Sequence, residues 1–188
     1  MVDIKDFVLD KFGIMDDVQD YADFLAKATD DFRAKAVVAE RLIEEAKSEI
    51  NSVHSERELR NLNLKEAFGV LRDLTRRLSE VIKRTNSVMQ KAQKEPKIWR
   101  KISGDFSKAK SAMDAFENKL EQSINELVLY QREQQTVLRE LEKSGLGENG
   151  SAMRPLSTRL GKLVGTIADV IAAVATVALL SAALGAKR

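Results

Sequence analysis

The chain has 188 residues, of which 44% are hydrophobic, 32% are charged and 5% are aromatic. It holds no cysteine and a single histidine, which excludes disulfide scaffolds, zinc fingers, thiol catalysis and histidine-based triads. The net charge of +2 conceals a basic block at 54–110 (net +8) between acidic blocks at 14–53 (net −5) and 111–153 (net −4), a pattern typical of neighbouring helices that attract one another.

The apolar residues of the first 53 positions recur at helical spacing. Within 1–13 they form one stripe, so this segment is predicted to be a short amphipathic N-terminal helix that ends at Gly13. From Val18 to Val53 the apolar positions follow steps of three or four, which predicts one long amphipathic helix. The many alanines of this second helix permit other helices to approach it closely.

The next segment contains signals for helix starts and a helix end. Residues 55–58 read SERE, a capping box that predicts a helix start, and Asn63 with Glu66 offers a second start. An amphipathic run follows, and Pro96 is predicted to end or kink that helix.

A third amphipathic run extends from Ile102 to Leu141, with Gly104 as a candidate break near its start. Each of the three long helices would measure roughly 45–65 Å. An apolar stripe of that length must be covered by other helices, and no β-type alternation is present. We therefore predict an all-α fold, in which an antiparallel bundle of long amphipathic helices occupies 14–143.

Residues 144–155 contain three glycines and a proline, so they are predicted to be a flexible linker to a hydrophobic helix within 156–188. The stretch 163–186 carries one charged residue, Asp169, and would span about 33–36 Å against a hydrocarbon core of about 30 Å. The same stretch is also consistent with a buried core helix. We favour a membrane helix over a buried core helix. One Asp costs about 2.5–3.5 kcal/mol on insertion scales, so insertion is expected to be marginal or conditional.

Three groups of residues are candidate sites at a membrane. Gly161 and Gly165 form a small-xxx-small pattern that is used for helix packing in bilayers. Trp99, Arg100 and Lys101 combine an aromatic ring with cations, as interfacial anchors do, or pack ordinarily at the end of the bundle. The predicted membrane segment is represented by Leu163, Ile167, Asp169, Ile171, Val174, Val177, Leu180 and Leu184.

The segments LKEAFGVLRDLTRRLSEVIK (64–83) and FSKAKSAMDAFENKLEQSINEL (106–127), separated by an irregular basic turn, resemble part of a known family. They are similar to the N-terminal helical bundle of the mixed-lineage-kinase-domain-like and HeLo-type cell-death proteins. The resemblance covers at most a third of the chain and implies a membrane-permeabilising four-helix bundle. This chain differs from that family in placing its apolar segment at the C-terminal end.

These observations predict a non-enzymatic protein that acts at a lipid membrane. It would be tail-anchored, or would insert conditionally as a pore-forming or membrane-perturbing homo-oligomer, with its bundle in the cytoplasm and a soluble form before insertion. No catalytic, metal or cofactor site and no small-molecule substrate are expected, because P-loop, dinucleotide and nucleophile-elbow motifs are absent. No nucleic-acid partner is expected, since no basic tail or aromatic platform is present. The alternative is a soluble coiled-coil scaffold or oligomerisation module that buries the C-terminal helix.

Overall fold

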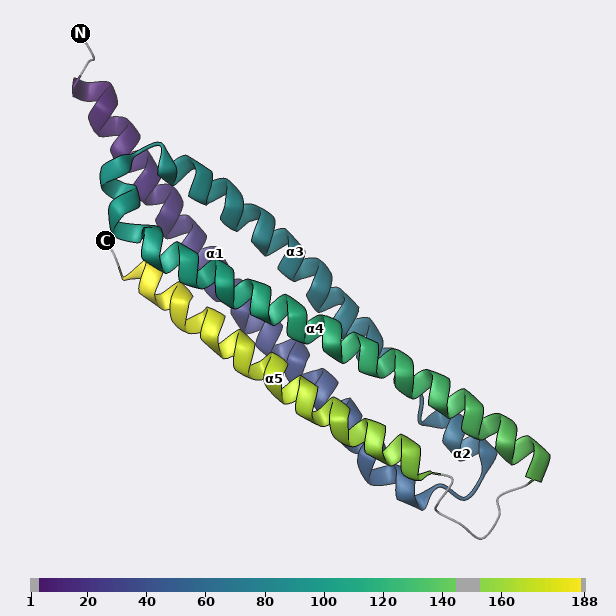
Figure 1. The fold of residues 1–188 in the computed structure, drawn as a ribbon. Helices are drawn as coiled ribbons and strands as arrows, with labels where there is room; N and C mark the ends of the chain where they lie inside the picture. The colour runs from purple at the N-terminus through teal and green to yellow at the C-terminus, as the bar shows by residue number, and fades with distance from the viewer. Residues whose placement is uncertain (1–3, 145–152, 187–188) are drawn as a thin grey trace. The chain divides into compact units, whose positions relative to one another are not determined.

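The computed structural model describes residues 4–144 and 153–186, with the side chains of 13–143 and 153–186 (Figure 1). The described part of the chain is an all-α bundle without strands, as predicted, and its last helix is the long apolar one. In chain order the elements are α1 (Ile4–Glu49), the short 3-10 turn η1 (Ile50–Ser52), α2 (Glu56–Asn61), α3 (Lys65–Gln93), α4 (Pro96–Ser144) and α5 (Arg154–Gly185).

Two expected helix breaks are wrong. Helix α1 continues through Gly13 and reaches 46 residues, so its described part has no separate N-terminal helix. Helix α4 likewise continues through Gly104 and reaches 49 residues. Both glycines lie on exposed positions where an added Cβ would meet no atom of the described chain within 4 Å. A glycine costs a helix only about 1 kcal/mol relative to alanine, so one glycine is not enough to end a helix that packs along much of its length.

The predicted start and end signals act where the sequence places them. Ser55 caps α2, because its side chain accepts a hydrogen bond from the Glu58 backbone N–H at 3.1 Å. The Glu58 carboxylate in turn accepts from the His54 backbone N–H at 2.7 Å. Asn63 accepts from the Lys65 backbone N–H at 3.3 Å, where α3 begins. These bonds satisfy backbone donors that a helix start leaves unpaired.

Helices α1, α3, α4 and α5 each contribute to two compact units. Unit 1 comprises the described residues within 1–33, 75–117 and 172–188, and unit 2 comprises those within 34–74 and 118–171. The C-terminal helix is therefore not a compact unit of its own, because its first part packs in unit 2 and its second part in unit 1. Most of the predicted linker, residues 145–152, lies outside the described residues.

Aromatic side chains from α1 and α4 form the centre of unit 1. The rings of Tyr21 and Phe106 stack with centroids 5.5 Å apart, and those of Phe32 and Phe116 meet edge-on at 5.4 Å. The Tyr21 hydroxyl lies 2.6 Å from the Thr85 hydroxyl of α3, and burial raises the pKa of Tyr21 to about 12. Such ring pairs stabilise a core by about 0.5–1.5 kcal/mol beyond the apolar area that they bury.

Cross-helix ion pairs in unit 1 show that α1 and α3 run antiparallel. Lys91 pairs with Asp17 at 3.6 Å, and Arg77 pairs with Asp31 at 3.5 Å. The residue number rises along α1 while it falls along α3 by the same amount. These pairs join the acidic and basic blocks of the sequence. Because their side chains are well exposed, each contributes at most about 1 kcal/mol.

Polar side chains of α4 complete the backbone hydrogen bonds at the end of α2 in unit 2. The Tyr130 hydroxyl donates to the Leu62 carbonyl at 2.9 Å, and the Gln134 side-chain amide donates to the Leu59 carbonyl at 2.7 Å. Burial raises the pKa of Tyr130 to about 12. Both side chains are buried, so they supply these hydrogen bonds away from water. The Leu59 carbonyl also accepts from the Leu62 backbone N–H at 3.1 Å.

Candidate membrane-interacting helix

Helix α5 packs on the bundle through a seam of large side chains. Pro155 suits its first turn, because the amide hydrogen that proline lacks has no partner there in any helix. Buried positions then follow in alternating steps of three and four, which keeps them on one side of the helix. The seam consists of Met153, Leu156, Leu160, Leu163, Ile167, Val170, Val174, Val177, Ser181 and Leu184.

The opposite face of α5 carries mostly small side chains and lies in solvent. Most of the large branched residues of α5 face the bundle, and alanine and glycine dominate the exposed side. Exposed positions include Gly165, Ala168, Asp169, Ala172, Thr176, Leu179 and Ala182. A face of small residues exposes little apolar area, so the helix can rest in water at low cost.

The predicted membrane residues divide between these two faces. Ile171 and Leu180 are half-buried, and Asp169 is exposed. The remaining five belong to the seam, namely Leu163, Ile167, Val174, Val177 and Leu184. The 18-residue window that makes this helix long and apolar enough to cross a membrane has a mean hydropathy of 2.3, yet only 28% of it is buried. The helix is thus neither enclosed by the bundle nor independent of it.

The glycines proposed for helix packing make no close approach within the chain. An added Cβ at Gly161 or Gly165 would find no described atom within 4 Å. Gly165 is exposed and Gly161 is half-buried. Their role in packing against a helix of another molecule stays a prediction.

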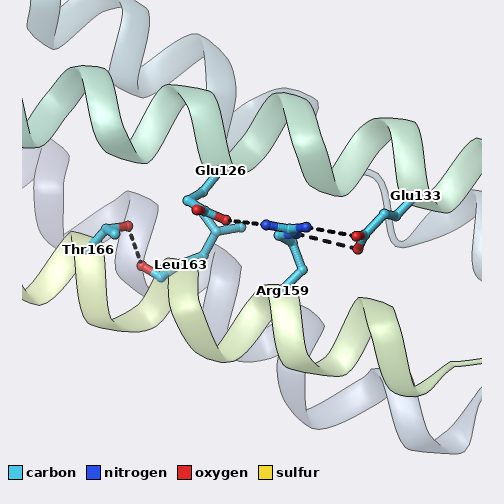
Figure 2. A network of polar contacts seen from close by, with 5 residues as sticks. All are labelled: Glu126, Glu133, Arg159, Leu163 and Thr166. Atoms are coloured by element: carbon cyan, nitrogen blue, oxygen red, sulfur yellow. Dashed lines mark hydrogen bonds and ion pairs between the residues drawn. The ribbon is translucent and has the colours of Figure 1, made fainter.

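One arginine of α5 is held by two carboxylates of α4 (Figure 2). The Arg159 guanidinium donates to Glu126 at 3.0 Å through Nη1 and to Glu133 at 2.8 Å through Nη2. Its Nε also donates to Glu133, at 3.4 Å. The side chains of Arg159, Glu126 and Glu133 are 19%, 22% and 32% exposed, so water screens this cluster less than the other cross-helix pairs. We call these three residues the carboxylate clamp.

Breaking the carboxylate clamp is expected to destabilise the fold. Arg159→Met should lower the free energy of unfolding by about 2 kcal/mol, because it leaves two partly buried carboxylates without a cation. Adding Glu126→Gln and Glu133→Gln should restore most of the loss, and chemical denaturation measures each step. Arg60→Met is the matched control. Arg60 also meets two carboxylates, Glu56 and Glu142, but its side chain is 54% exposed, so its loss should be barely measurable.

Four further polar groups of α5 find partners within the protein. Asp169 pairs with Lys119 of α4 at 3.6 Å. The hydroxyls of Thr166, Thr176 and Ser181 donate to carbonyls of α5 itself at 3.0, 3.2 and 2.7 Å. Serine and threonine often bond to their own helix in this way, and the bond persists without water. The hydroxyls are therefore no obstacle to apolar surroundings.

The candidate interfacial anchor lies at the start of α4. The half-buried Trp99 ring packs 6.2 Å from that of Phe106, between the buried residues Ile98 and Ile102. Arg100 and Lys101 are exposed. The tryptophan is therefore partly covered by packing within unit 1, and its cationic neighbours face solvent. Its role as an interfacial anchor stays a prediction.

No family model, no curated protein and no solved structure matches this chain. The resemblance to HeLo-type bundles therefore remains a prediction. Helix α5 is the one helix among the described residues that is long and apolar enough to cross a membrane.

Proposed function

We propose that this protein is a non-enzymatic, membrane-associating helical bundle whose α5 inserts conditionally into a lipid bilayer. In the soluble form α5 docks on the bundle through its seam. When the seam contacts break, α5 leaves the bundle and enters the hydrocarbon interior of the bilayer. One observation carries this proposal: the most apolar 18-residue window of α5 has a mean hydropathy of 2.3, yet only 28% of it is buried.

The energetic balance favours a conditional rather than a permanent insertion. The apolar part of α5 is long enough for a hydrocarbon core of about 30 Å. Asp169 opposes insertion by about 2.5–3.5 kcal/mol, and its pair with Lys119 is lost on release. The seam and the carboxylate clamp also hold the helix on the bundle. Small changes in any of these contributions would shift the population between the docked and the inserted states of α5.

We further propose that several copies of the protein perturb the membrane together. Once α5 leaves the bundle, Gly161 and Gly165 would lie on a face open to a second α5. Small residues at this spacing let two helices approach closely in a bilayer. Association of released helices would give the pore-forming or membrane-perturbing oligomer.

A second candidate function is a soluble scaffold or oligomerisation module in which α5 is a permanent bundle helix. The regular steps of three and four along the seam favour it, because such spacing is typical of helices that pack on other helices. The two candidate functions predict different effects when a charge is placed on the buried or on the exposed face of α5.

Removing the charge of Asp169 tests the proposed insertion. Asp169→Leu should increase the fraction of protein that floats with liposomes and resists alkaline carbonate extraction, because insertion no longer buries a carboxylate. The matched control is Asp30→Leu, the same substitution at an exposed position of α1. An unchanged carbonate-resistant fraction for Asp169→Leu would show that this residue does not meet lipid.

A further inference from the structure

A shallow groove runs between α4 and α5 in unit 1. Its volume is about 520 Å³, and it is largely open to solvent. Polar and apolar groups share its lining: an ammonium group and three hydroxyls stand beside methyl and isobutyl groups. The lining residues are Ser107, Lys108, Ser111 and Ala112 of α4 with Thr176 and Leu180 of α5.

A large apolar side chain projects into solvent next to this groove. Leu179 is 74% exposed, the highest value among the large hydrophobic residues of the described chain, and it precedes the groove residue Leu180. The part of α5 in unit 1, residues 172–185, contains no charged residue. Full burial of a leucine side chain is favourable by about 1.5–3 kcal/mol, so this edge of α5 would gain from an apolar environment.

The α4 side of the groove is basic. Lys97, Lys101 and Lys108 are spaced by four and seven residues, which places them on one face of the helix, and all three are exposed. Over 96–111 the sequence has five basic residues and one acidic residue. A stripe of lysines therefore leads along α4 to the position where Leu179 and Leu180 of α5 lie.

We propose that this groove docks unit 1 on the surface of a bilayer that contains anionic phospholipids. The Lys108 ammonium group and the hydroxyls of Ser107 and Ser111 would meet lipid phosphates, and Leu179 would enter the boundary between headgroups and acyl chains. The lysine stripe matches the negative potential of such a surface. The inference rests on the proposed function in assuming a membrane partner, but it does not need α5 to leave the bundle.

Vesicle sedimentation of the full chain tests this docking. Binding to vesicles of phosphatidylcholine mixed with phosphatidylglycerol should exceed binding to phosphatidylcholine alone and should weaken as salt is added. Lys108→Gln should weaken binding to the anionic vesicles about fivefold. Leu179→Ala should weaken it about tenfold. The matched controls Lys47→Gln and Val37→Ala change exposed residues of α1 in unit 2 and should bind as the unchanged protein does.

Three results would overturn the docking proposal. The first is equal binding to both kinds of vesicle, and the second is an equal loss of binding in the Lys47 or Val37 controls. The third is a combined result, in which inorganic phosphate at constant ionic strength displaces the protein from the vesicles and Leu179→Ala does not weaken vesicle binding. That result would show that the groove binds free phosphate. Vesicle binding without a carbonate-resistant fraction would instead contradict the insertion of α5 and leave the docking proposal intact.

Discussion

An engineered disulfide between the end of α5 and α1 should abolish membrane insertion. A Cβ added at Gly185 would lie 3.8 Å from the Ala22 Cβ, which is the usual separation of the Cβ atoms in a disulfide. The oxidised Ala22→Cys/Gly185→Cys protein cannot release the end of α5 from the bundle. We therefore expect its carbonate-resistant membrane fraction to fall to background, while the reduced protein inserts normally. The cross-link should also raise the free energy of unfolding by about 3–5 kcal/mol, since it closes a very long loop.

The chain has no natural cysteine, so no other disulfide can form within one molecule of this variant. The reduced double variant and the two single variants control for the substitutions themselves. Liposome flotation followed by carbonate extraction measures insertion, and urea denaturation measures stability. Equal insertion of the oxidised and reduced forms would show that α5 need not be released, and the proposed conditional mechanism would be wrong.

Charges placed on the two faces of α5 should have sharply different effects in solution. Val174 is buried in the seam, so Val174→Asp puts an unpaired carboxylate in an apolar interface and should cost about 3–5 kcal/mol of unfolding free energy. Ala172 is exposed, and Ala172→Asp should cost only a few tenths of a kcal/mol, through repulsion from Asp169 one turn away. Thermal and urea unfolding of the soluble protein compare the two variants.

The same two variants, Val174→Asp and Ala172→Asp, distinguish the two candidate functions. In a bilayer both positions lie near the middle of the apolar stretch, so each aspartate should raise the free energy of the inserted state by about 2.5–3.5 kcal/mol. Val174→Asp also destabilises the docked state, so the two effects largely cancel, and only Ala172→Asp should show a clear loss of insertion. If α5 is instead a permanent bundle helix, Ala172→Asp should behave as the unchanged protein does in every assay. A loss of insertion in Ala172→Asp without a loss of stability would be the result specific to the membrane proposal.

The regular parts of this fold could be predicted from sequence because their signals are local. Apolar residues at steps of three and four fix which side of α1, α3 and α4 is buried, and Tyr21 and Phe106 are among the core residues that follow from that spacing. Capping by Ser55 and the end of α3 before Pro96 depend on groups a few residues apart. Gly13 and Gly104 misled the prediction, since packing elsewhere along each helix outweighs one unfavourable residue.

The length and hydropathy of α5 were likewise determined by sequence alone, since both depend only on composition along one helix. The tertiary structure decided which of its faces is covered, because a hydropathy average does not record on which side of the helix each residue lies. It also decided that Arg159 meets Glu126 and Glu133, residues about thirty positions earlier in the chain. Such a contact depends on the register between two antiparallel helices, and that register is set by the packing of all their side chains together.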